Sequence, residues 1–461
     1  MLLCDFATLQ LCNSKEMKEL IGKLKGDRGI WAFVALLSLF SFMPVFSAST
    51  NLVYVVGNGS IVGHLIKHLV HVFIGFCFIY FVHRTPYHYF KAFSWWLMPV
   101  VIILLGFTML QGTTIGGANA SRWLQIPFIG VSFQPSAFAF LVMMVYVARY
   151  LSKIDEKEYT FKSSLIELWM PVFGIIGLIL PANFSTAALM FSMVCMLVFV
   201  GKYRLQYLFT IIGLGIASLL IFILIAKAFP DNKLTSRVNT WMSRIERFSS
   251  DEENEDDYQI EKAKIAIASG KIYGLGPGKS VQKNFLPQSS SDFIYAIIVE
   301  EYGLLGGFVI MGLYLLLFFR FLITSHKAPT LFGKLLIVGL GFPIIFQAFT
   351  NMGVAVELLP TTGQTLPLIS SGGTSIWMTC IAVGIILSVT KKEEEIAQIE
   401  AEARLRDEAL QRIIDREVAL ESESENEIDE IVERAKKAEA GENYSIEDHT
   451  DNPMNAVLNK K

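Results

Sequence analysis

Ten apolar segments run through this chain, and most of them are long enough to cross a lipid bilayer as helices. They occupy residues 29–49, 62–82, 93–111, 133–151, 166–183, 186–201, 206–228, 293–323, 333–352 and 373–390. A helix needs about 20 apolar residues to cross the hydrocarbon core. Of the 461 residues, 53% are hydrophobic, which is more than is usual in a soluble protein. The sequence predicts an all-α polytopic membrane protein with about ten transmembrane helices.

Three of these segments have unusual lengths. The fifth and sixth are short, and only residues 183–185 separate them. We interpret them either as a tight hairpin of two spans or as a partly re-entrant pair. The eighth segment is overlong for a single crossing, so it either tilts or extends out of the membrane.

Lys and Arg residues in the connecting loops indicate the orientation, because short cytoplasmic loops carry an excess of them. Loops 50–61 and 353–371 contain neither residue, and loop 112–132 contains only Arg122. The alternate loops are basic, as is the N-terminal tail. This alternation predicts that both termini face the cytoplasm. It also predicts that residues 229–292 form a large extracytoplasmic loop between helices 7 and 8.

The sequence divides into three regions by charge. Residues 1–28 form a cytoplasmic N-terminal tail, residues 29–392 a ten-helix membrane domain, and residues 393–461 a charged cytoplasmic tail. The C-terminal tail is rich in Glu, Arg and Ala to about Gly441, a composition that favours helix. Its apolar residues fall near heptad spacing with interruptions. We interpret it as a solvated single helix, with a weak coiled coil as the alternative.

Ionisable residues in the second span need an explanation, because each one costs about 2.5–3.5 kcal/mol on membrane insertion. His64, Lys67, His68 and His71 lie on one helix face. Histidines at this spacing can bind a metal ion, but no carboxylate or Cys accompanies them. We favour a polar face turned towards the protein interior, on which Lys67 meets an anionic headgroup.

Further candidate anion contacts lie in the predicted outer loops. Arg122 is either an interfacial anchor or a phosphate contact made by an always-charged planar group. Lys279 and Lys283 follow the glycine-rich run 274–278. This run is not a nucleotide-binding P-loop, because its glycines are one residue too close and a proline removes one N–H donor. We interpret it as a turn at the membrane edge that approaches a phosphate-bearing lipid.

Asp292 is the candidate general base. It stands where the large loop enters the eighth span, and a partly desolvated carboxylate suits this role. An Asp at such a place is also a frequent helix N-cap, and the two roles are compatible. Glu300 and Glu301 follow about two turns later. At least one of them is expected to pair with a cation or to be protonated.

The segment Leu359–Ser375 joins the last two spans and contains two prolines and three glycines. Irregular backbone of this kind survives at membrane depth only where it is buried in protein or lines a cavity. The segment is therefore expected to be an ordered loop, and its Ser370 and Ser371 are candidate substrate contacts.

Taken in order, these segments resemble the SEDS family (FtsW, RodA and SpoVE), the membrane glycosyltransferases of bacterial cell shape, division and sporulation. The resemblance covers roughly residues 30–392. The matching segments are Leu359–Ser375, which is the strongest, Leu286–Ile294, Glu300–Gly303, Gly270–Lys283 and Arg244–Gln259. Thr365 before Leu366–Pro367 looks more like the division members (FtsW) than the elongation members (RodA).

The resemblance implies a peptidoglycan glycosyltransferase that polymerises lipid II into glycan strands during cell division. Asp292 matches the family's essential aspartate and would take the proton of the attacking GlcNAc 4-hydroxyl, with inversion at the donor's anomeric carbon. The leaving group is undecaprenyl pyrophosphate, which cations must stabilise. The predicted substrate-binding residues are Lys67, Arg122, Lys279, Lys283, Glu300, Ser370 and Ser371. A divalent cation, Mg²⁺ or Mn²⁺, is a candidate helper with unknown ligands, and no nucleotide is expected.

The resemblance also implies partners and a location. Family members work with a class B penicillin-binding protein, an FtsI-like transpeptidase that crosslinks the strands, and with other divisome proteins. The expected location is the bacterial cytoplasmic membrane at the division septum, and no nucleic acid is expected as a partner.

The chain departs from the family pattern at several places. Residues 290–292 read Ser-Ser-Asp where the family usually has His-Thr-Asp, and Ala137 stands where a carboxylate is expected. The usual Pro-Asp between spans five and six reads Pro-Ala-Asn at residues 181–183. Because Asp292 is kept, we expect the reaction to survive with altered surroundings.

Two other classes of function remain open. The first is a lipid II flippase, for which buried Lys67, Glu300 and Glu301 would suit a headgroup path. The second is a non-enzymatic scaffold that recruits division proteins through residues 393–461. Lipid scrambling without polymer would favour the flippase, and dependence on the tail but not on Asp292 would favour the scaffold.

Overall fold

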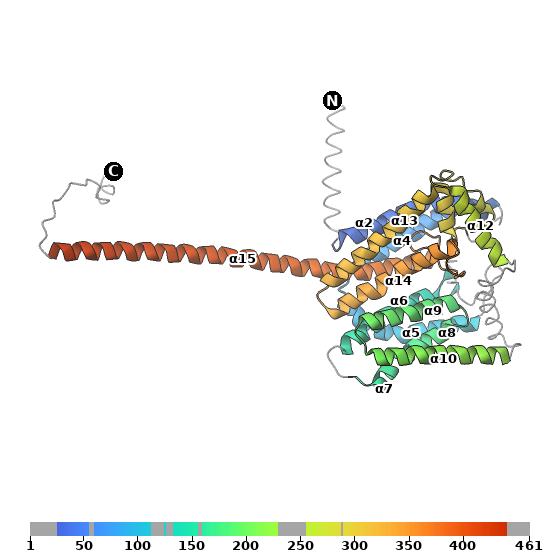
Figure 1. Ribbon diagram of the computed structural model, residues 1–461, viewed down its shortest axis with the longest axis horizontal. Coiled ribbons are helices and arrows are strands. Elements are labelled where there is room, and N and C mark those ends of the chain that lie inside the picture. Colours follow the sequence, from blue (N-terminus) through green and yellow to red (C-terminus); the bar gives the residue numbers. More distant parts are fainter. Residues whose placement is uncertain are drawn as a thin grey trace, which may run out of the picture. The chain divides into compact units, whose positions relative to one another are not determined.

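The computed structural model describes residues 25–54, 60–111, 124–125, 132–154, 159–228, 255–286 and 289–439. The chain divides into two compact units, Met1–Glu394 and Glu395–Lys461. Within the described residues, the first unit is a bundle of apolar helices with one short strand pair (Figure 1). The second unit contains the C-terminal part of one long helix.

The helices and strands follow one another along the chain with short connections between most of them. The helices are α2 (Arg28–Phe40), α3 (Phe42–Tyr54), α4 (Ile61–Arg84), α5 (His88–Gln111), α6 (Pro135–Ile154), α7 (Phe161–Ser164), the π-helix η1 (Leu165–Trp169), α8 (Met170–Ile179), α9 (Phe184–Val200), α10 (Leu205–Ala228), α12 (Glu255–Gly270), the 3₁₀-helix η2 (Gln282–Asn284), α13 (Ile294–Lys327), α14 (Leu331–Ala355) and α15 (Gly373–Glu439). The strands β1 (Leu124–Gln125) and β2 (Ser132–Phe133) pair antiparallel, with Leu124 opposite Phe133.

Among the described residues, nine segments are long and apolar enough to cross a membrane, and the 17-residue helix α9 is a shorter apolar one. The first segment combines α2 with most of α3, and the fifth combines α7, η1 and α8. The predicted all-α polytopic fold with about ten spans is therefore confirmed. The fifth and sixth segments are two packed helices, α8 and α9, as in the hairpin interpretation.

Several helices begin at a residue whose side chain caps them. Asp27, Ser60, Asn183 and Thr330 each accept a hydrogen bond from the backbone N–H three residues later, at the start of α2, α4, α9 and α14. Such caps satisfy one of the N–H groups that a helix end leaves unpaired. The boundaries of these spans thus follow from local polar residues as well as from hydropathy.

Helix α14 forms the centre of the bundle, and α10 lies at its edge. α14 packs against α13, α6 and α9, and most of its side chains are buried. α10 packs mainly against α9, and many of its large apolar side chains are exposed. Exposed apolar surface of this extent marks a membrane contact.

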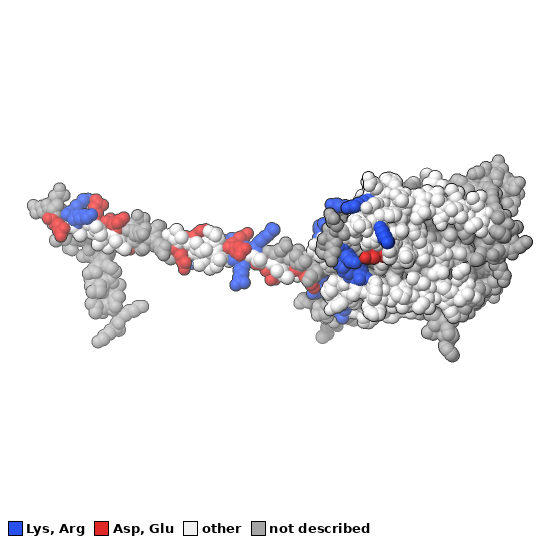
Figure 2. Space-filling view, turned by 90° about the horizontal axis from the view of Figure 1, so that it is seen from below, with Lys and Arg blue, Asp and Glu red and all other residues white. Residues whose placement is uncertain are grey.

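The charged residues of the first unit contribute little to the surface seen in Figure 2, where most of its described atoms are uncharged and the Lys and Arg side chains gather at one end. A partly buried ion pair and a hydrogen bond link three helices at Asp27. Asp27 at the start of α2 accepts from Arg320 of α13 through both carboxylate oxygens, at 2.8 and 2.7 Å. The Asp27 backbone N–H donates to the Thr390 hydroxyl of α15 at 3.0 Å. A planar two-point contact of this kind fixes geometry as well as charge.

Helix α15 continues beyond the first unit to Glu439, close to the predicted end near Gly441. Its side chains from Ala401 to Val418 are exposed. Surface pairs one turn apart, such as Arg434 with Glu430 at 3.0 Å, contribute at most about 0.5 kcal/mol each.

The overlong eighth span is explained by a break. α13 has 34 residues, or about 51 Å at 1.5 Å per residue, whereas the hydrocarbon core is about 30 Å thick. The helix is interrupted at Gly303, whose backbone has φ 70° and ψ −176°. The nine residues before the break belong to the protein's interior rather than to a single straight crossing.

Candidate functional site

The break at Gly303 is built around residues 271–276, which run beside α13. The N–H groups of Leu304 and Leu305 donate to the carbonyls of Lys271 and Ile272 at 2.9 and 3.3 Å. In return, the Glu300 and Glu301 carbonyls accept from the backbone of residues 275 and 276, both at 2.9 Å. Four backbone groups around the break thus have partners outside α13, as burial favours.

Close approach of the two backbones depends on glycine. A Cβ at Gly303 would lie 2.1 Å from the Ile272 carbonyl oxygen. The positive φ of Gly303 would also strain any other residue. Gly270 and Gly274 meet α13 in the same way, with 2.0 and 2.2 Å to the nearest backbone oxygen. The glycines that resemble a phosphate loop in the sequence therefore serve, in part, to seat this segment on α13.

Glu300 holds the next turn of the same loop. Its carboxylate accepts from the Ser280 hydroxyl and from the backbone N–H groups of Val281 and Gln282, at 2.9 and 3.2 Å. Its side chain has no exposed surface. Hydrogen bonds from three donors compensate the burial of this side chain. The predicted substrate contact Glu300 is thus engaged with the protein's own loop.

Glu301 and Lys283 are joined through a serine of the first span. The Lys283 ammonium donates to the Ser47 hydroxyl at 3.2 Å and to the Gly278 carbonyl at 2.8 Å. The Ser47 hydroxyl donates to Glu301 Oε1, which also accepts from the Ser280 N–H at 3.3 Å. Lys283, Ser47 and Glu301 are all buried. Glu301 Oε2 has no hydrogen-bond partner among the described residues.

Asp292 lies in the turn just before α13, partly buried, against the loop of residues 357–372. A Cβ at Gly363 would lie 3.5 Å from Asp292 Oδ2. The N-cap of α13 is Phe293, which makes no side-chain cap. The turn is held from outside, because the Ser370 hydroxyl donates to the Ser291 carbonyl at 2.6 Å. The Ser371 N–H similarly donates to the carbonyl of residue 290 at 2.9 Å.

Helix α14 holds both the Asp292 turn and the 357–372 loop. The amide nitrogen of Asn351 donates to the Asp292 carbonyl at 2.7 Å and to the Gln364 carbonyl at 2.8 Å. One turn earlier, Gln347 donates to the Thr365 carbonyl at 3.0 Å. The irregular loop predicted from its prolines and glycines is therefore ordered, and its residues 366–370 are buried in the protein.

The histidine face of α4 turns inward, as its sequence pattern predicts. The His68 ring lies 2.8 Å from the Ser41 hydroxyl, and the His71 ring stacks on Trp377 of α15 with centroids 5.4 Å apart. A Cβ at Gly373 would lie 3.0 Å from His71 Nε2. Lys67, one turn before His71, is exposed.

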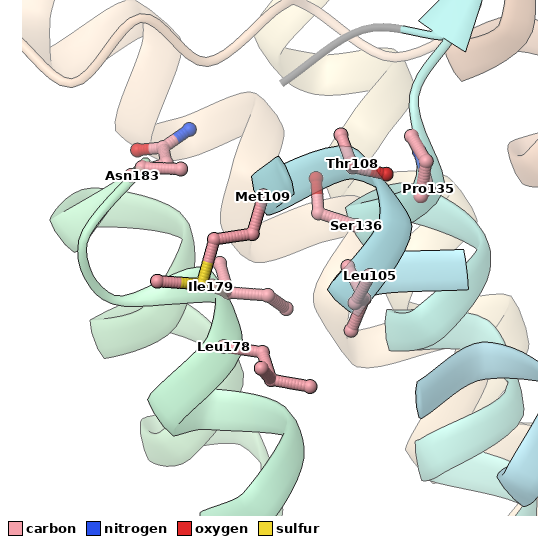
Figure 3. A pocket seen from close by; sticks show the side chains of 9 residues that line it. Leu105, Thr108, Met109, Pro135, Ser136, Leu178, Ile179 and Asn183 are labelled. Carbon is pink, nitrogen blue, oxygen red and sulfur yellow. The ribbon is translucent and has the colours of Figure 1, made fainter. Parts of the chain in front are cut away.

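A small open cavity of about 20 Å³ lies between α5, α6 and α8 (Figure 3). Its wall is mostly apolar, with the polar groups of Thr108, Ser136 and Asn183 at the helix ends. Asn183 caps α9 at Thr186, whose hydroxyl accepts from the Gln364 side chain at 3.1 Å. The cavity is thereby linked through one short chain of contacts to the loop that faces Asp292.

The structure gives the predicted site residues different settings. Asp292, Ser370 and Ser371 come together at the Asp292 turn, although the Ser370 hydroxyl is buried and binds backbone. Lys67 and Lys279 are exposed, whereas Lys283 and Glu300 are buried and bonded to the protein. Arg122 lies outside the described residues. Sequence reasoning missed Ser47 and Asn351, and only Asn351, a polar residue in an apolar span, carried a signal.

The described residues do not provide a complete set of ligands for the predicted divalent cation. Across the described ranges, no group of three or more His, Cys, Asp or Glu side chains is arranged to hold a metal ion. Asp292 is the carboxylate that faces the 357–372 loop. Mg²⁺ is commonly held by one or two carboxylates together with substrate phosphates, and only that arrangement fits these donors.

The fold and this site define a multi-pass membrane protein in which a carboxylate faces an ordered loop between the last two spans. Residues 27–395 match the family model of the cell cycle protein family FtsW/RodA/SpoVE, and the chain belongs to that family. The probable peptidoglycan glycosyltransferase FtsW of Coxiella burnetii is 31% identical over 372 residues, which are 79% of this chain and 96% of that protein. Stage V sporulation protein E of Bacillus subtilis is 28% identical and covers 70% of this chain.

Solved structures share the fold. A chain from a structure described as "Structural coordination of polymerization and crosslinking by a peptidoglycan synthase complex" superposes with a TM-score of 0.61 at 22% identity, covering 80% of this chain and 99% of that one. The rod shape determining protein RodA of Thermus thermophilus gives 0.57 at 22% identity, covering 80% and 98%. The predicted resemblance to this family is confirmed.

Proposed function

We propose that this protein is a peptidoglycan glycosyltransferase that polymerises lipid II at the outer face of the bacterial cytoplasmic membrane during cell division. The observation that carries this proposal is the family match over residues 27–395 together with the fixed position of Asp292 against the 357–372 loop. Relatives named probable peptidoglycan glycosyltransferase FtsW support the same activity and the division role.

Asp292 acts as the general base in this proposal. As the acceptor's GlcNAc 4-hydroxyl oxygen attacks the donor's anomeric carbon, Asp292 takes the hydroxyl proton. The bond from that carbon to the pyrophosphate oxygen breaks, and undecaprenyl pyrophosphate leaves with the bonding electrons. A base in hydrogen-bond reach of the attacking hydroxyl contributes about 10²–10⁴-fold.

The exposed cations are the proposed contacts for the leaving pyrophosphate. Lys67 and Lys279 are free to reach a headgroup, because both side chains are exposed, and Arg122 joins them in the proposal. Lys283 and Glu300 act instead by holding the 271–286 loop. Ser370 and Ser371 position the Asp292 turn through its backbone. We expect chelation with EDTA to lower activity, with Mg²⁺ or Mn²⁺ carried by the substrate's pyrophosphate.

The cavity between α5, α6 and α8 is the proposed place for part of an isoprenoid chain. Its apolar wall includes Leu105, Met109 and Leu178, and polar groups lie at its rim (Figure 3). A lipid-linked sugar can then enter from the bilayer while its headgroup reaches Asp292.

The same proposal includes a partner and an orientation. A class B penicillin-binding protein of the FtsI-like kind would crosslink the strands, in company with other divisome proteins. A solved structural neighbour is described as part of a peptidoglycan synthase complex, which supports such a partner. Both termini would face the cytoplasm, and the protein would gather at the division septum.

The test is polymerisation of purified lipid II by the full-length protein, with and without a cognate class B penicillin-binding protein. Glycan strands from the wild type, reduced at least about 100-fold in Asp292→Asn, would support the proposal. If neither protein makes strands even with partner and Mg²⁺ present, the glycosyltransferase proposal is wrong. Lipid scrambling by the same preparation would then favour a flippase.

A further inference from the structure

Asn351 is a side chain of a buried helix, α14, that binds both the Asp292 turn and the 357–372 loop by hydrogen bonds. Its Nδ2 donates to the Asp292 carbonyl at 2.7 Å and to the Gln364 carbonyl at 2.8 Å. Both partners are carbonyl oxygens, which only accept, so the NH₂ end of the amide must face them. The side chain is 1% exposed, so water does not replace either bond readily.

We propose that Asn351 is a positioning residue for the glycosyl transfer, because its amide fixes the backbone at Asp292 and thereby aims the carboxylate. This inference rests on the proposed function. Asn351 touches neither the carboxylate nor, in this proposal, the substrate. It acts through the peptide group of Asp292 and sets the distance between that residue and the loop it faces.

The start of α13 depends on such outside support. Phe293 occupies the N-cap position and offers no capping group. Three donors instead hold the turn from the other side: Asn351, the Ser370 hydroxyl and the Ser371 N–H. Two of the three come from the 357–372 loop itself, and Asn351 alone comes from a buried helix. Asn351 therefore ties the Asp292 turn directly to the helix bundle.

The buried setting makes the contact costly to lose. Removing the amide leaves two partly buried carbonyls each short of a donor, which costs more than an exposed hydrogen bond would. The Asp292 turn then relaxes away from α14. A displacement of about 1 Å at a reacting group costs about 100-fold in rate.

Gln347 provides a matched control on the same helix, one turn before Asn351. It also donates to the 357–372 loop, at the Thr365 carbonyl and hydroxyl, 3.0 and 3.4 Å away. Among the described residues, no hydrogen bond joins its side chain to the Asp292 turn. A variant of Gln347 therefore loosens the loop from α14 without removing a bond to Asp292.

The experiment compares Asn351→Ala, Asn351→Asp and Gln347→Ala in the full-length protein. Asn351→Asp keeps the size of the side chain but not its donors. We expect both Asn351 variants to lower kcat by about 100-fold with KM for lipid II within about twofold of wild type. We expect Gln347→Ala to lower kcat by less than about tenfold.

A second readout does not depend on activity. Amide hydrogen exchange, followed by mass spectrometry on peptides that cover residues 289–297, reports opening of the Asp292 turn. We expect faster exchange there in both Asn351 variants and wild-type exchange in Gln347→Ala. Unchanged exchange in the Asn351 variants, or an equal loss of kcat in Gln347→Ala, would overturn the positioning role.

The two proposals fail in different ways. If wild-type protein makes no glycan while exchange still changes only in the Asn351 variants, the glycosyltransferase proposal is wrong and Asn351 only holds the turn. If wild type polymerises and Asp292→Asn does not, but Asn351→Ala retains full kcat, the positioning role is wrong and the proposed function stands.

Discussion

The two parts of α13 on either side of Gly303 are built for different surroundings. From Ile294 to Glu301 every side chain is buried, including two carboxylates. After the break, large apolar residues such as Leu305, Phe308 and Val309 are exposed, with exposed fractions of 51%, 59% and 61%. The first part has the setting of a core element in a soluble domain, and the second has that of a membrane span facing lipid.

This contrast explains how α13, interrupted at Gly303, can serve both the membrane and the site. The part after Gly303 has 24 residues, Leu304–Lys327, which is enough to cross the hydrocarbon core alone. The part before it needs no lipid contact, because residues 271–286 cover it on one side and α3 on another. Asp292 is therefore held by the packing of the part of α13 before Gly303, and not by the membrane-spanning part after it.

Substitution of Gly303 is expected to have the largest effect, because it removes the division between the two parts. In Gly303→Ala the new Cβ would lie 2.1 Å from the Ile272 carbonyl oxygen, on a backbone with φ 70°. We expect a loss of about 3 kcal/mol or more in stability and loss of polymerisation. Thermal unfolding in detergent and the lipid II assay measure the two effects.

Gly312→Ala is the matched control in the second part of the helix. Nothing lies within 4 Å of a Cβ at this position, and Ala favours helix over Gly by about 1 kcal/mol. Unfolding at or above the wild-type temperature is expected. If Gly303→Ala behaves like Gly312→Ala, the break does not separate two structural parts.

Hydropathy was sufficient to predict the spans, since apolar length is a local property of the sequence. The overlong eighth segment was visible for the same reason. The break in this segment was not predicted, because the helix is interrupted at Gly303 only through contact with a segment about 30 residues earlier in the chain. An isolated glycine in a helix pattern lowers helix stability but does not show what approaches it.

The site was predicted in part. Asp292 and the ordered loop could be found from their position and from the prolines and glycines of residues 359–375. The buried partners could not, because Ser47 meets Lys283 across 236 positions. At least one of Glu300 and Glu301 was expected to pair with a cation or to be protonated, and the structure shows Glu300 bonded to backbone N–H groups and a serine. Hydrogen bonds from backbone N–H groups do not depend on the type of residue that donates, so the sequence does not reveal them.

Glu300→Gln is expected to have the second-largest effect, because this carboxylate holds the loop that covers the first part of α13. The introduced NH₂ group would face donors from residues 280–282. We expect a loss of about 2 kcal/mol, with faster proteolysis of the 271–286 loop. Urea or thermal unfolding of the purified protein measures the loss.

The control for Glu300 is Glu357→Gln at the surface. Glu357 pairs with Lys264 at 2.5 Å, with both side chains about half exposed. Solvent screening reduces such a pair to at most about 0.5 kcal/mol. Equal losses in the two variants would mean that Glu300 contributes charge alone and does not hold the loop.

Ser47→Ala is expected to have the smallest effect of the three, since it removes one bridging hydroxyl between Lys283 and Glu301. The charges remain, and the methyl group leaves a Lys donor and a carboxylate oxygen each short of one partner. We expect a loss of about 1 kcal/mol.

Ser49→Ala is the control on the same helix, because its buried hydroxyl donates to the Val45 carbonyl of its own helix. A Ser49→Ala loss as large as that of Ser47→Ala would show that α3 contributes no polar link to the first part of α13. A larger loss in Ser47→Ala that disappears in the Lys283→Met background would assign the difference to the bridge itself.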